Sequence, residues 1–137
     1  MVDDRLNPFI RLHVFLYKLT DGKIGGRMRG APVLLLTTIG RKSGRYRTTP
    51  VLYLQRDHDW VVVASNAGRS KNPAWYYNLR ANPDAAIRIR EQVMKVHAKE
   101  ASAEERDRLW PVLVKMFSAY DGYRKKTNRR IPLIVLE

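Results

Sequence analysis

The sequence contains no cysteine among its 137 residues. This absence excludes disulfide bonds, thiolate metal sites, iron–sulfur clusters and a cysteine nucleophile. Acidic residues are also few, since 13 Asp and Glu stand against 26 Lys and Arg and leave a net charge of +13. No apolar run approaches the roughly 20 residues of a membrane-spanning helix, and Asp3 and Asp4 replace the basic flank of a signal peptide. These absences predict a cytoplasmic protein.

The excess of positive charge is unevenly distributed along the chain. Residues 22–83 carry eleven basic side chains and two acids, whereas residues 84–120 carry seven bases and six acids. A second basic group occupies residues 124–130. Such a surface is expected to bind an anionic partner, which is a nucleic acid, a lipid surface or a phosphorylated small molecule. Apolar runs interrupt both basic regions, so the charge belongs to a folded domain rather than to a disordered tail.

Residues 1–30 are expected to form an amphipathic helix followed by a glycine-rich basic connector. Asn7 and Pro8 are typical of a helix start, and apolar residues then recur at helical spacing as far as Leu19. In one interpretation this helix packs on the rest of the protein. In the other it lies on a membrane surface, with its basic residues facing anionic head groups.

Residues 31–137 are predicted to form a single domain of mainly β structure with flanking α-helices. The extended patterns cover residues 33–39, 45–55, 60–65, 85–91, 92–100 and 131–136. A short helix is predicted from Pro73, and a longer one after the capping box at residues 102–105, with Pro111 bending it or falling near its start. Because βαβ alternation is absent, antiparallel strands in meander order favour a small barrel over a doubly wound sheet.

Metal and hydrolytic chemistry have little support. His13, His58 and His97 lie on a predicted helix, turn and strand, without the spacing of a metal motif. Ser43 and Ser65 sit in no nucleophile elbow. We therefore expect no metal in the site.

The turn Gly40-Arg41-Lys42-Ser43-Gly44 is the most distinctive local motif. Glycines at both ends allow backbone N–H groups to converge on an anion, while Lys42 adds a point charge and Arg47 a bidentate fork. The motif is not a Walker loop, because the Walker spacing is absent and no helix follows. A solvated hairpin tip is the alternative interpretation, and the residues around the turn favour the phosphate site.

Three motifs in combination resemble the deazaflavin-dependent nitroreductase family, flavin/deazaflavin oxidoreductases of split β-barrel fold (the FMN-binding-like barrel) found mainly in actinobacteria. They are the turn at residues 40–44, the strand Arg47-Thr48-Thr49-Pro50-Val51 and the segment Asn72-Pro73-Ala74-Trp75-Tyr76-Tyr77-Asn78-Leu79. The resemblance covers the chain from Pro32 to Glu137. It implies binding of coenzyme F-420, an 8-hydroxy-5-deazaflavin, and hydride transfer from it to a hydrophobic, electron-poor acceptor such as menaquinone or a nitro compound.

The resemblance also implies roles for individual residues. Lys42 and Arg47, helped by Arg41 and the Ser43 backbone, are expected to hold the coenzyme phosphate, with Arg45 and Arg69 near its acidic tail. The residues expected beside the ring are Thr48, Thr49, Pro50, Val51 and Leu52. Those expected on its other side are Val63, Ala64, Ser65 and Asn66. Those expected to close the site are Ala74, Trp75, Tyr76, Tyr77, Asn78 and Tyr120.

An aromatic stripe, Phe117, Tyr120 and Tyr123, follows the longer helix. In the nitroimidazole-reducing member of the family, tyrosine occupies all three positions and shapes the substrate pocket. Phe117 lacks that hydroxyl here, which leaves nitroimidazole reduction open. Without the resemblance, the stripe would be interpreted as core packing. Tyr120 and Tyr123 can bond an acceptor carbonyl, and Ser65, Tyr120 and solvent are the candidate proton donors.

Two other functions compete with the reductase hypothesis. The charge, with interspersed Trp and Tyr, is compatible with a nucleic-acid-binding domain, and the split-barrel resemblance is compatible with an FMN- or haem-binding protein. We favour the F-420-dependent reductase, acting as a monomer without a nucleic-acid partner. A menaquinone-like acceptor would also explain a membrane-facing N-terminal helix at the inner face of the membrane.

Overall fold

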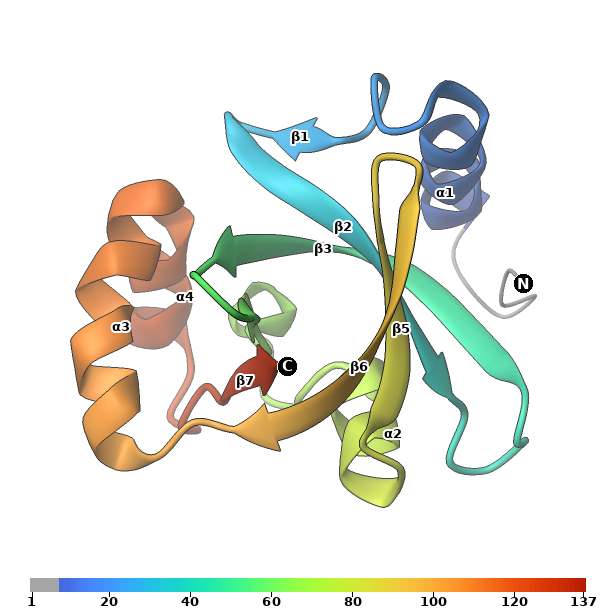
Figure 1. Cartoon of the computed structure of the whole chain (residues 1–137). Helices are drawn as coiled ribbons and strands as arrows, with labels where there is room; N and C mark the ends of the chain where they lie inside the picture. The colour runs from blue at the N-terminus through green and yellow to red at the C-terminus, as the bar shows by residue number, and fades with distance from the viewer. Residues whose placement is uncertain (1–7) are drawn as a thin grey trace.

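Six antiparallel strands close into a barrel in the computed structural model, which describes residues 8–137 (Figure 1). Around the barrel the strands follow the order β2 (Ala31–Ile39), β3 (Tyr46–Gln55), β4 (Trp60–Val63), β7 (Leu133–Leu136), β6 (Gln92–Glu100) and β5 (Asp84–Ile89). Pairing of β5 with β2 closes the ring. The two-residue strand β1 (Arg27–Met28) pairs with the start of β2. The predicted antiparallel barrel is confirmed.

The predicted meander order holds from β2 to β4 and is wrong beyond β4, which is followed around the barrel by β7, β6 and β5. The last strand, β7, inserts between β4 and β6 and pairs with both. All four of its residues, Leu133–Leu136, are buried. A strand that is apolar at every position is stable where both of its faces are covered. Leu133 and Val135 pack in one core cluster, and Ile134 and Leu136 pack in the other. The structure also begins this strand two residues later than the predicted Ile131.

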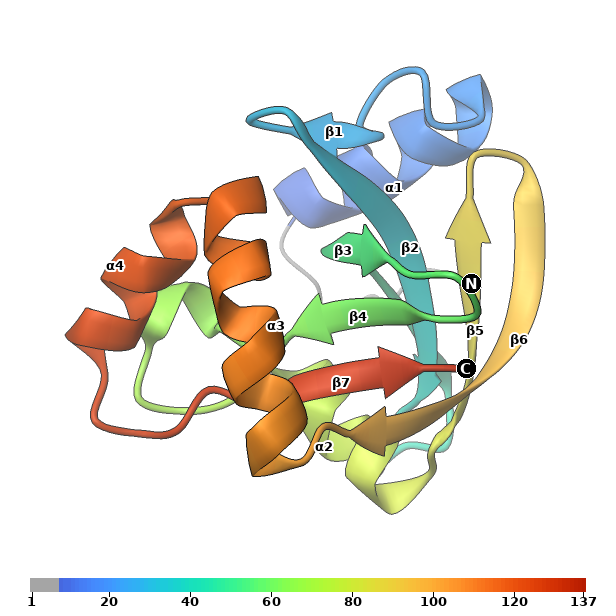
Figure 2. The same cartoon turned by 60° about the vertical axis from the view of Figure 1, so that its left-hand side comes forward.

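Helices cover the outside of the barrel. They are α1 (Pro8–Thr20), the 3-10 turn η1 (Asn66–Gly68), α2 (Ala74–Ala81), α3 (Ala103–Met116) and α4 (Ala119–Lys126). Figure 2 shows α3 and α4 together on one side, with α1 across the strands on another. The Ser102 side chain accepts a hydrogen bond from the Glu105 N–H at the start of α3, as the capping box predicted.

Some local features differ from those that the sequence predicts. Pro111 lies well inside α3 rather than near its start, and the helix continues beyond it to Met116. The sequence patterns did not predict α4 or β1. The predicted helix cap at Asn7 lies outside the described residues, and the division of the chain at residue 30 stays a prediction.

The core has two parts, one on each face of β2. Val33 and Leu35 pack with residues of α1, α3 and α4. Leu34 and Leu36 face the other way and pack with residues of α2, β5 and β6. Successive side chains of a strand point to opposite faces, so a strand covered on both faces is apolar at consecutive positions.

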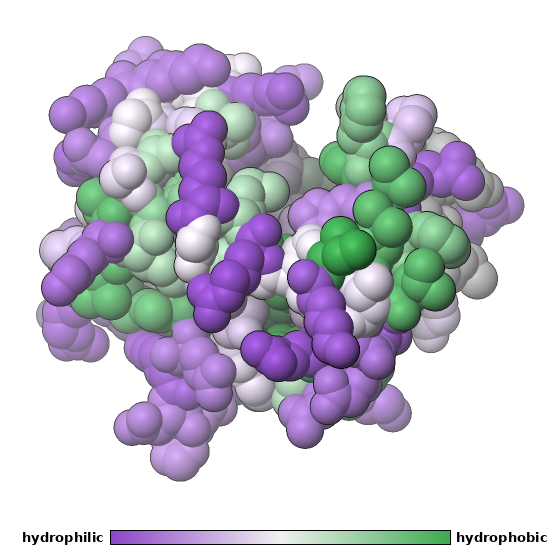
Figure 3. All heavy atoms as spheres, turned by 90° about the horizontal axis from the view of Figure 1, so that it is seen from above, coloured by the Kyte–Doolittle hydropathy of each residue, from purple (hydrophilic) through white to green (hydrophobic). Residues whose placement is uncertain are grey.

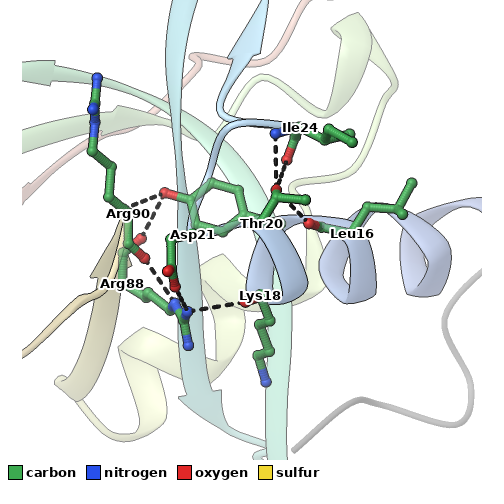
Figure 4. A network of polar contacts seen from close by, with 8 residues as sticks. Leu16, Lys18, Thr20, Asp21, Ile24, Arg88 and Arg90 are labelled. Atoms are coloured by element: carbon green, nitrogen blue, oxygen red, sulfur yellow. Dashed lines mark hydrogen bonds and ion pairs between the residues drawn. The ribbon is translucent and has the colours of Figure 1, made fainter.

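The C-terminal end of α1 is fixed to the barrel by polar contacts (Figure 4). The Tyr17 hydroxyl lies within donor distance of the carbonyl oxygens of Val33, at 3.1 Å, and Arg88, at 3.2 Å, and accepts from the Arg90 N–H at 2.9 Å. Arg88 donates to the Lys18 carbonyl at 3.2 Å and to Asp21 at 2.8 Å. One face of α1 is therefore packed on the barrel.

Candidate functional site

A cavity of about 700 Å³ lies where β2, β3, η1, α2 and α4 meet. Its size lies within the range of small-molecule sites. The structure brings together most of the predicted site residues along its wall: Arg41, Lys42, Ser43, Arg47, Thr48, Thr49, Pro50, Val51, Leu52, Val63, Ser65, Asn66, Ala74, Trp75, Asn78, Phe117, Tyr120 and Tyr123. Segments that are far apart in the sequence, from the turn at residue 40 to the helix that ends at residue 126, thus line the same cavity.

Four predicted residues, including Arg45 directly after the basic turn, lie outside this wall. Ala64 is fully buried in the core beside α2. The Tyr76 hydroxyl donates to Glu100 at 2.7 Å, and the Tyr77 ring carries the guanidinium of Arg41 at 4.9 Å from its centroid. The structure therefore gives Tyr77 a supporting place behind the basic turn, while Tyr76 and Ala64 pack inside.

Hydrogen bonds fix the conformation of the basic turn, residues 40–44. The Gly40 N–H donates to the Arg45 carbonyl at 2.7 Å, and the Gly44 N–H donates to the Gly40 carbonyl at 2.8 Å. Gly44 has φ of 71°, a left-handed conformation that favours glycine. The Ser43 hydroxyl accepts from Arg47 Nη2 at 3.0 Å. This contact orients the Arg47 fork at the same end of the cavity as Arg41 and Lys42.

Asn78 connects this turn to helix α2. Its Nδ2 donates to the Thr38 hydroxyl at 3.0 Å, and its Oδ1 accepts from the Arg41 N–H at 3.1 Å. Asn78 and Thr38 are both buried. A buried amide that satisfies both partners fixes the position of the turn. The sequence analysis placed Asn78 at the site and missed Thr38, although a threonine within an apolar strand was a signal.

The strand edge between the basic turn and the barrel has no strand beside it. β3 pairs with β2 from Tyr46 to Leu52, but its pairing with β4 covers only Tyr53–Gln55. Among residues 8–137, no strand pairs with the other edge of residues 49–52. Such an edge offers backbone N–H and C=O groups to a ligand. A flat ring with carbonyl and N–H groups, joined to a phosphate, fits an open strand edge beside three cationic side chains.

The other end of the cavity is aromatic. The Phe117 and Tyr120 rings lie 5.0 Å apart, and Tyr123 lies 6.4 Å from each. Burial, and to a smaller extent the neighbouring Tyr123, raises the pKa of Tyr120 well above its usual value. Tyr120 is therefore a protonated hydrogen-bond donor at neutral pH. Ile10 and Met28 also line the cavity. Neither was predicted, because both lie in the N-terminal segment that the sequence assigns to a separate part of the chain.

The described part of the chain, residues 8–137, holds no group of three or more His, Asp and Glu side chains suited to a metal ion. His13 contacts the Gly25 carbonyl at 2.8 Å, and His97 contacts Asp84 at 3.0 Å. Within the same residues, no helix is long and apolar enough to cross a membrane.

Fold and cavity together define the class of protein, a split β-barrel domain with a small-molecule site. Comparison with known families agrees with this class, because a family model described as F420H(2)-dependent quinone reductase matches residues 9–137. The chain belongs to this family.

Individual relatives support the assignment. A protein of Mycobacterium tuberculosis named F420H(2)-dependent quinone reductase is 39% identical over 131 residues, which cover 93% of this chain and 88% of the relative. A solved F420-H2 dependent reductase is 36% identical with a TM-score of 0.71, covering 77% of this chain and 94% of that chain. A second solved structure, described as a domain-swapped dimer, is 32% identical with a TM-score of 0.73, covering 94% and 97%.

These matches confirm the family resemblance and the enzyme class. The particular acceptor, the reduction of nitro compounds, the roles of the site residues, the position at a membrane and the monomeric state stay predictions.

Proposed function

We propose that the protein transfers a hydride from reduced coenzyme F-420 to a quinone such as menaquinone. The observation that carries this proposal is a single cavity that joins a cationic turn to an apolar, aromatic wall in a chain of this family. When bound, the deazaflavin supplies the two-electron chemistry. The chain contributes binding, orientation and proton donors.

The binding roles follow from the chemistry of the two ends. Arg41, Lys42 and Arg47 hold the phosphate, because two guanidiniums and an ammonium converge at the turn. Strand residues 48–52 and the loop at residues 65–67 orient the ring. Arg69 also lines the cavity and is placed to meet the acidic tail, whereas Arg45 lies outside the cavity wall.

The aromatic end serves the acceptor. Reduction of a quinone by hydride leaves negative charge on an oxygen, which then takes a proton. Tyr120 keeps its own proton because of its raised pKa, so it acts as a hydrogen-bond donor to that oxygen rather than as a base. Ser65, Tyr123 and solvent are the remaining proton donors, and Phe117 supplies apolar contact.

Binding of the coenzyme is the first test. Tryptophan fluorescence reports on the site because Trp75 lines the cavity. We expect low-micromolar or tighter binding of coenzyme F-420 by the wild type. The double variant Lys42→Ala, Arg47→Ala should lose about 100-fold or more, since each charge-assisted phosphate contact contributes about tenfold or more. The double variant Arg108→Ala, Lys115→Ala, which removes the same charge at exposed positions of α3, is the matched control.

The outcomes separate the competing functions. A wild type that does not bind the coenzyme contradicts the proposal. A yellow or red protein on purification would favour FMN or haem instead. Tight binding of DNA that falls steeply with salt would favour a nucleic-acid-binding domain. Turnover of menaquinone and of a nitroimidazole, measured side by side with reduced coenzyme, then identifies the preferred acceptor.

The outer face of α1 supports a peripheral position on the cytoplasmic side of a membrane. Phe9, Leu12, Phe15 and Leu19 are 81%, 53%, 58% and 68% exposed. Figure 3 shows hydrophobic side chains gathered on the side that carries α1, with hydrophilic ones beside them. Exposed basic residues of the following connector, Lys23, Arg27 and Arg29, provide the charge that anionic head groups attract. Ile10 of the same helix lines the cavity, so a lipid-soluble quinone would enter beside it.

Vesicle binding tests this placement. The wild type should sediment with vesicles of phosphatidylglycerol and phosphatidylcholine, and less with phosphatidylcholine alone. The double variant Leu12→Gln, Phe15→Gln should bind at least about tenfold more weakly, because two apolar side chains no longer enter the bilayer. Val112→Gln, a change on α3 at a residue that is 48% exposed, is the control. Equal binding by the wild type and the double variant would contradict the placement.

We also propose that the protein acts as a monomer, because the barrel closes within one chain. Light scattering at several concentrations tests this. A concentration-independent dimer mass would contradict it and would resemble the domain-swapped relative.

A further inference from the structure

Arg129 lies behind the cavity wall and binds the loop that follows β4. Its Nη2 donates to the Ser65 carbonyl at 2.6 Å, its Nε donates to the Arg69 carbonyl at 2.8 Å, and its Nη1 donates to the Ala64 carbonyl at 3.2 Å and to Asn72 Oδ1 at 2.6 Å. No carboxylate among the described residues pairs with this guanidinium. All of its side-chain hydrogen bonds therefore end on neutral oxygens of one short segment.

The bound loop has an unusual backbone. Asn66, Ala67 and Gly68 are consecutive left-handed residues, with φ of 46°, 53° and 74°. For a residue with a side chain this conformation costs about 1–2 kcal/mol, so the surrounding contacts must hold it. Helix α4 packs closely against this loop, because a Cβ on Gly68 would lie 2.9 Å from the Tyr123 carbonyl oxygen.

The carbonyls bound by Arg129 determine where the neighbouring N–H groups point. In a trans peptide the C=O and N–H bonds point in opposite directions, and none of the described peptides is cis. The Ala64 and Ser65 carbonyls face Arg129, so the N–H groups of Ser65 and Asn66 point away from it. Neither N–H has a hydrogen-bond partner among residues 8–137. Ser65 and Asn66 line the cavity, whereas Arg129 does not.

We propose that Arg129 is the positioning residue of the coenzyme site, turning the peptide N–H groups of Ser65 and Asn66 into the cavity as donors to an electron-rich carbonyl or ring nitrogen of the bound deazaflavin. This inference rests on the proposed function for the identity of the ligand. The positive charge behind the two peptides strengthens them as donors, because no carboxylate compensates it. Arg129 itself does not touch the ligand.

Three measurements on Arg129→Met and Arg129→Lys test the proposal, with Arg130→Met as the control that removes an exposed neighbouring charge. The first is the affinity for coenzyme F-420. The second is the visible absorption band of the bound coenzyme, which responds to hydrogen bonds on the ring and which a general loss of stability would not move. The third is amide hydrogen exchange in the coenzyme-free protein at Gly68 and Arg69, whose N–H groups donate to the Ser65 and Asn66 carbonyls.

For Arg129→Met we expect affinity to fall about tenfold, because two peptide N–H donors to the ligand are no longer held in position. The absorption band should move toward that of free coenzyme, and exchange at Gly68 and Arg69 should accelerate while exchange at Val135 in β7 does not. Arg129→Lys should be intermediate, since an ammonium cannot reach all four acceptors. Arg130→Met should match the wild type.

Wild-type affinity and absorption in Arg129→Met, or unchanged exchange at the loop, would overturn the proposal. If that variant does not fold, Arg129→Lys decides the matter, and wild-type behaviour in all three measurements would overturn it. If the wild type itself does not bind the coenzyme, the proposed function fails, and the exchange measurement still shows whether Arg129 holds the loop.

Discussion

Replacing Asn78 by alanine should destabilise the protein and loosen the basic turn at the same time. The amide of Asn78 connects α2 to the Thr38 hydroxyl and to the Arg41 N–H. Thr38 is 1% exposed and Asn78 is 6% exposed. Loss of the amide therefore leaves the buried Thr38 hydroxyl without its present partner.

The size of the effect follows from these contacts. Loss of a hydrogen bond that leaves its buried partner unsatisfied costs about 1–3 kcal/mol, and the more accessible bond to Arg41 contributes about 1 kcal/mol. The free energy of unfolding of Asn78→Ala should thus fall by about 2–4 kcal/mol. For a chain of this length the midpoint of thermal unfolding should drop by roughly 8–15 °C. Coenzyme affinity should weaken several-fold, because Arg41 and Lys42 are no longer held in place.

A double-mutant cycle in urea isolates the pair. Thr38→Val keeps the shape of the side chain and removes the hydroxyl, so the cycle with Asn78→Ala reports their mutual contact. We expect a coupling energy of about 1 kcal/mol. Asn82→Ala, which removes an exposed hydrogen bond to the Asp84 N–H at the end of the same helix, serves as the control. Additive losses within about 0.3 kcal/mol would refute the reasoning.

Three further predictions concern the cavity wall. The folded pKa of Tyr120 is raised above its unfolded value, so its contribution to stability is complete below about pH 10 and is lost as pH rises further. Tyr120→Phe should therefore reduce the alkaline loss of unfolding free energy in urea titrations, and an unchanged slope would contradict this. Ala67→Gly should raise the free energy of unfolding by up to about 1 kcal/mol by relieving a left-handed alanine, and a decrease in urea unfolding would argue against strain there. Phe117→Tyr should raise nitroimidazole turnover relative to menaquinone turnover, and an unchanged ratio would exclude this hydroxyl from acceptor choice.

Most of the barrel could be predicted because its signals are local. Alternating or continuous apolar runs identify each strand, and the turn residues between them set the boundaries to within a few positions. The position of β7 beside β4 could not be predicted, since it depends on pairing between segments some seventy residues apart in the chain. Helix α4 escaped prediction for a different reason: it has one buried residue, Tyr120, and carries Gly122 in its middle. Packing against η1 and α3, rather than helix propensity, holds it in place.

In the candidate site too, residues within local sequence motifs could be predicted, whereas residues defined by contacts between distant segments could not. Arg41, Lys42 and Arg47 could be identified because a cationic turn between glycines is visible within a few letters of sequence. Asn78 was assigned to the site through the resemblance, but its partner Thr38 lies 40 positions away. Arg129 could not be identified, since most of its acceptors are backbone carbonyls, which every residue has and which leave no trace in sequence.

The hydrogen bonds of the arginine side chains show how the net positive charge acts. Few acids are present to pair with so many arginines. Two guanidiniums bind backbone carbonyls: Arg106 binds that of Ile131, and Arg129 binds those of Ala64, Ser65 and Arg69. A carbonyl oxygen accepts the hydrogen bonds of a guanidinium but carries no net charge to compensate the positive one. These cations contact the backbone of the barrel, and their electrostatic field adds to that of Lys42 in the cavity wall. A polyanionic coenzyme would be attracted by this whole field, so its association rate, more than its dissociation rate, should fall as salt is added.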